Sequence, residues 1–185
     1  GDLDPILDAR EADLSPGREW TGWHAIEKDL WPADAEDGFA AYSQSKRSQL
    51  ASGLITHTRE LNSRVAHMTF TLCELSNGAI GLLDEVATGK VTGEEEIWSH
   101  TDLWDFQANV DGARVLYEGL RPILLVKNKS LATAIDSELS KLQDLLNLHK
   151  EGSGFVYYDQ LSTSQVRALS DQVNALAERL NELTA

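Results

Sequence analysis

The chain has 185 residues, enough for one domain with a substantial core or for two small bundles that share helices, and it contains no apolar run long enough to span a bilayer. Its 30 acidic and 16 basic residues give a formal net charge of −14. This balance argues against nucleic acid as the main partner, because a phosphate backbone requires a basic surface, and it makes cations the more natural ligands.

Helical patterns cover nearly the whole chain, and turn-forming residues separate them. Asp4-Pro5 has the form of an N-cap followed by proline at the first helical position. Ser15-Pro16 repeats this form just before a tryptophan-rich helix, which Pro32 ends. The next two predicted helices cover about residues 38–69 and 72–88.

Gly89 is expected to stop the second of these helices, and a new helix is expected to begin soon after it. The stretch Thr92-Gly93-Glu94-Glu95 has the form of a capping box, in which the threonine and the glutamate three residues later bond each other's backbone amides. The helix that it opens is predicted to reach about Arg121, where Pro122 either kinks or ends it.

The last part of the chain is predicted to hold two more helices with one loop between them. The first covers about residues 130–150, the loop is GSGFVYYDQLS, and Ser162 or Thr163 caps a final helix that reaches Leu183. No stretch of any length alternates apolar and polar residues as a strand does, so the predicted class is all-α. Without a linker or repeat, we expect residues 1–185 to form a single domain.

Cys73 is the only cysteine, so it cannot form an internal disulfide. It lies in TFTLCEL among apolar neighbours, which favours a buried structural thiol over a nucleophile.

The stretch GWHAIEKDLW gives the first sign of a functional site. On a helix, positions 20, 24, 27 and 31 share one face, which aligns Trp20, His24, Glu27 and Trp31. Tryptophans carry large apolar areas that are usually buried, so the histidine and the glutamate are expected inside the protein. An imidazole and a carboxylate three residues apart can bind one metal ion, and they suit iron, zinc or copper better than calcium or magnesium. The alternative is a core histidine hydrogen-bonded to its neighbour.

Further acidic residues are candidates to complete such a site. In EEEIWSHTDLWDFQANVDG, a helical reading places Asp102 and Asp105 at the edge of an apolar face. Buried carboxylates need basic partners or a metal, although an exposed helix edge is an equally open reading. In DAREAD, Arg10 lies between Asp8 and Glu11, and it either positions a ligand-binding carboxylate or belongs to a surface ion-pair network.

A zinc peptidase would need H-E-x-x-H or H-x-x-E-H, since it uses two histidines, a glutamate and an open coordination position. After His24 and Glu27 this chain has Lys28, where the inverted motif requires a second histidine. There is no G-x-S-x-G elbow either, so hydrolysis has no support from the sequence.

Several segments together resemble the imelysin-like family, specifically its EfeO and EfeM iron-uptake branch. Gly22, His24 and Glu27 match its G-x-H-x-x-E signature. The segments that carry the resemblance are DLDPILDAREAD, EWTGWHAIEKDLW, NGAIGLLDEVATGKVTGEEEIWSHTDLWDFQANVDGA, GFVYYDQLS and ALSDQVNALAERL.

The resemblance implies an all-helical fold built as a pair of four-helix bundles with a cleft between them. Relative to the family, the chain is expected to lack an N-terminal helical segment that bears a glutamate. The resemblance also implies an extracytoplasmic protein, either periplasmic or a cell-envelope lipoprotein. This protein would bind ferrous or ferric iron, with zinc or copper as other possible ions. The implied partners are an iron permease and a haem peroxidase-like protein of the same uptake system.

The family takes the histidine and the glutamate of its signature as metal ligands. The resemblance therefore implies His24 and Glu27 as ligands, completed by Asp105 or Asp102 and by Glu11. Because metal ligands must be deprotonated, the affinity for metal is expected to fall as pH drops through the ordinary pKa of histidine, about 6.5. Some relatives are classed as peptidases and one is associated with an acidic polysaccharide, so a metallopeptidase and a metal-dependent polysaccharide binder remain the alternatives.

Overall fold

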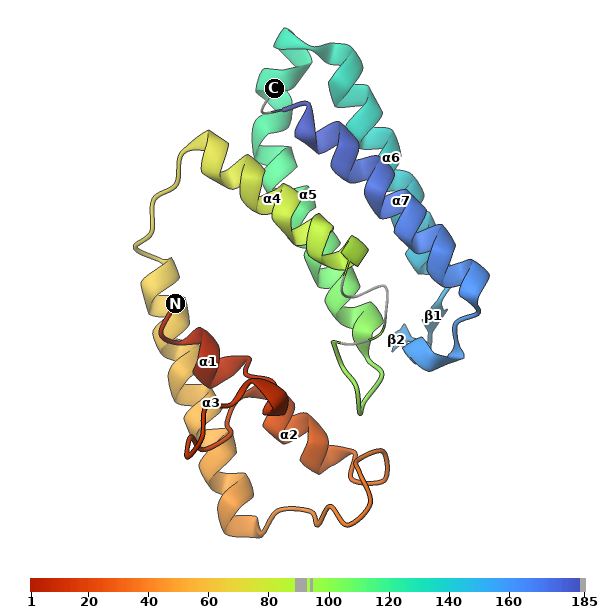
Figure 1. Ribbon diagram of the computed structural model, residues 1–185. Helices are drawn as coiled ribbons and strands as arrows, with labels where there is room; N and C mark the ends of the chain where they lie inside the picture. The colour runs from red at the N-terminus through yellow and green to blue at the C-terminus, as the bar shows by residue number, and fades with distance from the viewer. Residues whose placement is uncertain (89–92, 94, 184–185) are drawn as a thin grey trace. The chain divides into compact units, whose positions relative to one another are not determined.

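The computed structural model describes residues 1–88, 93 and 95–183, and its elements are helical apart from one short hairpin (Figure 1). The predicted all-α class is therefore confirmed. The chain forms two compact units, residues 1–69 and residues 70–185. The prediction of a single domain over residues 1–185 stays a prediction. No helix among the described residues is long and apolar enough to cross a membrane.

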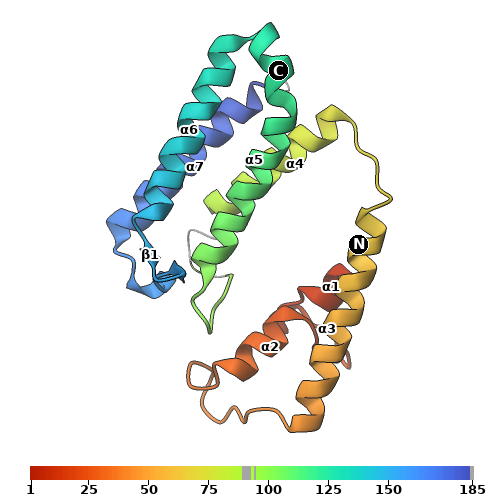
Figure 2. The ribbon, with the colours of Figure 1, turned by 180° about the vertical axis from the view of Figure 1, so that it is seen from behind.

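The second unit is a four-helix bundle. Its helices are α4 (Leu72–Thr88), α5 (Asp102–Lys127), α6 (Lys129–Asn147) and α7 (Thr163–Asn181). Each helix packs against two others, so that α4, α5, α6 and α7 form a closed ring, and Figures 1 and 2 show them side by side from both directions. The large apolar core of the protein lies inside this ring, with residues from all four helices and from the 154–158 segment.

Local sequence signals explain where two helices of the bundle begin. The Asn128 side chain accepts a hydrogen bond from the Leu131 N–H at the start of α6. Ser162 and Gln165 form a capping box at the start of α7, which confirms Ser162 as the N-cap. Between these helices, β1 (Lys150–Glu151) pairs antiparallel with β2 (Gly154–Phe155), and the 3₁₀ helix η3 (Tyr158–Gln160) follows.

Helix α5 departs from its predicted bounds at both ends. It begins at Asp102 rather than soon after Gly89, because His100 has a positive φ of 54° that interrupts a helix. Thr92 and Glu94 of the expected capping box, and Gly89, lie outside the described residues. The helix also passes through Pro122 and ends only at Lys127.

The prediction of a buried Cys73 is wrong, since its side chain is exposed. The apolar neighbours in TFTLCEL did not mark a buried segment, since Phe70 of that stretch is itself 51% exposed, and Cys73 lies in the first turn of α4. Cys73 lines a pocket of about 370 Å³ in the second unit. The other lining residues are Ser76, Leu120, Ile123, Leu124, Lys127 and Leu183.

The first unit is built on α3 (Gln44–Val65), against which α1 (Asp4–Leu7) and α2 (Trp23–Leu30) pack. It also holds the 3₁₀ helix η1 (Glu11–Asp13). Ser43 caps α3 through the Lys46 N–H, so this helix starts later than the predicted range of 38–69. It also ends earlier than that range, at Val65. Residues 1–69, all of which are described, contain three α-helices.

Candidate metal centre in the first unit

The tryptophan-rich helix begins later than the sequence suggested. Ser15-Pro16 opens a turn, and α2 starts only at Trp23, so Trp20 lies before the helix. Gly22 is the N-cap of α2 and has a φ of 92°, a conformation that side-chain-bearing residues rarely adopt. A Cβ added at Gly22 would lie 2.2 Å from the Leu7 carbonyl oxygen. Glycine is therefore required for the end of α1 to pass this close to the start of α2.

This close approach brings Asp8 next to α2, because Asp8 directly follows Leu7. Two hydrogen bonds fix the same crossing: Thr21 Oγ1 donates to the Ile6 carbonyl at 2.9 Å, and Trp20 Nε1 donates to the Ala9 carbonyl at 2.7 Å. The segment that carries Asp8 is thus held on both sides.

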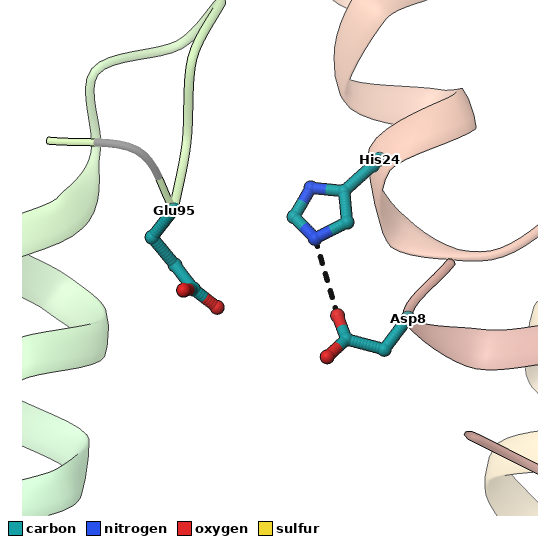
Figure 3. Close-up of side chains that lie close together, drawn as sticks. All are labelled: Asp8, His24 and Glu95. Atoms are coloured by element: carbon teal, nitrogen blue, oxygen red, sulfur yellow. Dashed lines mark hydrogen bonds and ion pairs between the residues drawn. The ribbon is translucent and has the colours of Figure 1, made fainter. Parts of the chain in front are cut away.

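His24 and Glu27 are buried, as the tryptophan-flanked stripe predicted; His24 is only 1% exposed. His24 Nδ1 lies 3.1 Å from Glu27 Oε2, and His24 Nε2 lies 3.1 Å from Asp8 Oδ1, the contact drawn in Figure 3. Arg10 Nη1 approaches the same Nδ1 atom at 3.3 Å. Glu95, also drawn in Figure 3, belongs to the second unit.

These contacts cannot all be satisfied by protons on the ring. A neutral imidazole has one N–H and one acceptor nitrogen, so only one of the two carboxylates can receive a hydrogen bond, and the other faces a lone pair. An imidazolium would donate to both carboxylates, but its Nδ1–H would then face the guanidinium of Arg10, which only donates. In a neutral ring, a carboxylate oxygen therefore faces a nitrogen lone pair, and a cation bound between these two atoms would turn that repulsion into two favourable contacts.

The donor atoms fit a transition metal. Imidazole nitrogen with carboxylate oxygen is a set that suits iron, zinc and copper. Metal–nitrogen and metal–oxygen bonds of about 2.0–2.2 Å leave neighbouring donor atoms roughly 3 Å apart, and the two nitrogen–oxygen distances here are both 3.1 Å. If a metal takes one ring nitrogen, the carboxylate on the other nitrogen orients the ring, an arrangement common at histidine-bound metals.

Glu11 lies against another side chain of α2. Its Oε2 lies 2.6 Å from Lys28 Nζ, and Glu36 Oε1 lies 2.7 Å from the same ammonium. Lys28 is buried and is enclosed by the rings of Trp20 and Phe39. Burial lowers the pKa of Lys28, but the hydrogen bonds that its ammonium donates to the two glutamates outweigh it and raise that pKa above its usual value. The role of Glu11 as a ligand stays a prediction.

Asp102 and Asp105 lie in the first turn of α5, in the second unit. Asp102 is fully buried; its Oδ1 accepts a hydrogen bond from the Glu96 N–H at 3.3 Å, and its Oδ2 has no hydrogen-bond partner among the described residues. Burial raises the pKa of this carboxyl above its usual value. Asp105 is partly buried. Their role as metal ligands stays a prediction.

The residues of DAREAD that contact His24 are Asp8 and Arg10. The sequence pattern pointed to Arg10 and the carboxylates around it, but it named Glu11 and not Asp8 as the ligand, and it held no signal that ranks the acidic residues of this segment. The segment changes from the last turn of α1 to extended backbone at Arg10 and then to η1, so no single periodicity predicts which side chain faces α2.

Fold and site together define an all-helical protein in which one buried histidine lies between two carboxylates. The chain matches the model of the imelysin family over residues 1–183, and it belongs to this family. It is 40% identical over 186 residues to an Efem/EfeO family lipoprotein of Staphylococcus haemolyticus (strain JCSC1435). It is 39% identical over 187 residues to one of Staphylococcus aureus (strain MRSA252). These alignments cover 99% of the chain but only 62% and 63% of the two relatives.

Proposed function

We propose that the protein binds iron as cargo in an extracytoplasmic uptake system, with His24 as the central ligand. The likeness to Efem/EfeO family lipoproteins supports a role associated with iron uptake and a location at the cell envelope. An iron permease and a haem peroxidase-like protein are the proposed partners. Zinc or copper can compete for the same donors, because they favour the same kinds of ligand.

The observation that carries this proposal is the placing of a carboxylate oxygen 3.1 Å from each ring nitrogen of one buried histidine. The Glu27 edge is the more enclosed of the two, since Glu27 is buried whereas the Asp8 side chain is half-exposed. The proposed ligand set is His24 and Glu27 with Asp8 as a further carboxylate, and Asp105, Asp102 and Glu11 remain candidates to complete it.

A metallopeptidase receives less support from the contacts around α2. Lys28, at the position where the inverted motif has its second histidine, is bound by Glu11 and Glu36. Its ammonium is positively charged and engaged in two short hydrogen bonds, so it is a poor metal ligand. Binding and release of an ion therefore describe the site better than hydrolysis.

The test is calorimetric titration of the protein with ferrous iron under anaerobic conditions, ferric citrate, zinc and copper. We expect His24→Ala to lower the affinity for the preferred ion at least about a hundredfold, because it removes the imidazole that contacts both carboxylates. His67→Ala is the matched control, since His67 is exposed in the same unit and should leave the affinity unchanged.

Equal affinity in wild type and His24→Ala would refute the proposed site. A second measurement, the apparent affinity between about pH 5 and 8, should show weaker binding at the acidic end, because protons compete with the metal for imidazole. Binding that is insensitive to pH over this range would also count against a histidine ligand.

A further inference from the structure

The guanidinium of Arg10 approaches the histidine at the centre of the proposed site, with Nη1 3.3 Å from His24 Nδ1. An arginine is always protonated and offers only donors, so this contact places a permanent positive charge at one of the two ring edges where a metal ion could bind. Coordination of a metal does not require such a charge, so its effect on metal binding has to be worked out from the contacts.

The position of Arg10 is set by its neighbours on both sides. The carbonyl of Ala9 accepts the indole N–H of Trp20 at 2.7 Å, and the carboxylate of Glu11 binds Lys28 at 2.6 Å. Both partners are buried, at 9% and 1% exposure. These contacts hold the chain on both sides of Arg10, and from this position the Arg10 side chain reaches His24.

Arg10 opposes a metal at the Nδ1 edge of the ring directly. To accept the N–H of Arg10, His24 Nδ1 must use the lone pair that a metal bound between Nδ1 and Glu27 would take. The two cations would also repel each other at this distance, in a site where burial weakens screening by solvent. Binding at this edge therefore requires Arg10 to withdraw.

The same contact opposes a metal at the other edge. When Nδ1 accepts from Arg10, the proton of a neutral imidazole lies on Nε2 and is donated to Asp8. A metal on Nε2 displaces that proton, and moving it to Nδ1 would make a donor face the donors of Arg10. Arg10 thus weakens metal binding whichever nitrogen is the ligand.

From these contacts we propose that Arg10 is a built-in competing cation, which holds the site in the absence of metal and is displaced when the metal binds. This inference rests on the proposed function and assigns Arg10 as the residue that sets how tightly the cargo is held. A carrier must release its ion, and a competing charge within the site weakens binding without removing a ligand. Arg10 then takes the place of the departing ion beside Glu27 and His24.

The test compares zinc and ferrous iron binding by wild type, Arg10→Met and Arg18→Met. Arg18 is exposed in the same unit, so its replacement changes the net charge equally without touching the site. We expect Arg10→Met to bind at least about tenfold more tightly than Arg18→Met and to release the ion more slowly to a chelator in a stopped-flow experiment. Arg10→Lys, which keeps a positive charge, should stay closer to wild type.

Affinity in Arg10→Met that equals or falls below that of Arg18→Met would overturn the proposal, since it would mean that Arg10 is neutral to binding or helps to position the ligands. If Arg10→Met does not fold, Arg10→Gln removes the charge while keeping a hydrogen-bond donor, and the same tightening is expected. His24→Ala, titrated in parallel, separates the proposed metal site from the proposed role of Arg10. If it binds as well as wild type, the site itself is wrong; if it loses binding and Arg10→Met gains none, only the role of Arg10 is wrong.

Discussion

Among the single residues of the site, Gly22 stands two positions before the histidine because no other residue type fits there. Its φ of 92° and the approach of the Leu7 carbonyl leave no place for a side chain. The consequence reaches the site, because the residue after Leu7 is Asp8, which bonds His24. The glycine is therefore part of the geometry that brings two segments together, although it binds nothing itself.

We expect Gly22→Ala to lower the free energy of unfolding by about 2–4 kcal/mol, because the new methyl group would be both strained and in contact with a backbone oxygen. Urea unfolding followed by tryptophan fluorescence measures this loss. Gly53→Ala is the control: Gly53 lies inside α3, and a Cβ added there would have no heavy atom within 4 Å, so alanine should stabilise that helix by up to about 1 kcal/mol. Similar effects at the two glycines would contradict this explanation.

Among the helices and strands, α2 is fixed by charged residues more than by apolar ones. Its buried residues are His24, Ala25, Glu27, Lys28 and Asp29. Asp29 Oδ2 accepts from Arg47 Nε of α3 at 2.6 Å, and its Oδ1 accepts from Arg47 Nη2 and from the Tyr42 N–H. An eight-residue helix with so small an apolar face depends on such contacts to hold its position.

This attachment predicts a pH-dependent stability of the first unit. Burial raises the pKa of Asp29, but the hydrogen bonds from Arg47 and Tyr42 outweigh it and hold that pKa below its usual value. A carboxyl with a lowered folded pKa stabilises the fold above its unfolded pKa of about 3.9, and this stability is lost as pH falls through the folded value.

Arg47→Met should therefore destabilise the protein at about pH 7 more than an exposed ion-pair variant does, and the difference from wild type should shrink below about pH 4. Urea unfolding at both pH values measures it. Arg167→Met, which removes an exposed pair with Asp171 on α7, should change stability by less than about 0.5 kcal/mol. A loss in Arg47→Met that is constant with pH would contradict the role of Asp29.

Across the molecule, the two units are stabilised differently. Every residue of the large apolar core lies between Ala79 and Leu180, inside the second unit. The first unit holds the candidate metal site and a set of ion pairs around α2. The candidate metal site and the ion pairs around α2 thus lie in the first part of the chain, and the large apolar core lies in the second.

The fragment 70–185 is accordingly expected to fold alone, with a helical circular dichroism spectrum and one cooperative thermal transition. Within it, Leu142→Ala should cost about 2–5 kcal/mol because Leu142 is fully buried in the core. Leu148→Ala is the matched control, since this leucine is 77% exposed and should change stability by less than about 0.5 kcal/mol. A broad, non-cooperative transition of the fragment would show that the bundle needs residues 1–69.

Several features could be predicted from the sequence because their causes are local. The bounds of α4 agree with the predicted range of 72–88, and Ser162 caps α7 as its side chain suggested. The apolar face predicted beside Asp102 and Asp105 consists of Leu103, Phe106, Val110 and Ala113, which are fully buried. Predicted helix bounds were wrong where backbone conformation set them. The start of α5 is an example, because the positive φ of His100 replaces the predicted helix with a turn.

For the candidate site, sequence patterns alone were enough to predict that His24 and Glu27 share a helix face and are buried, because helical spacing and flanking tryptophans act over a few residues. They were also enough for the all-α class. Which residues of DAREAD meet the histidine became clear only from the packed structure, which places Asp8 and Arg10 on its ring and Glu11 on Lys28. The physical reason is that this choice depends on the crossing of α1 and α2 at Gly22, a contact with the backbone of Leu7 that no local pattern encodes.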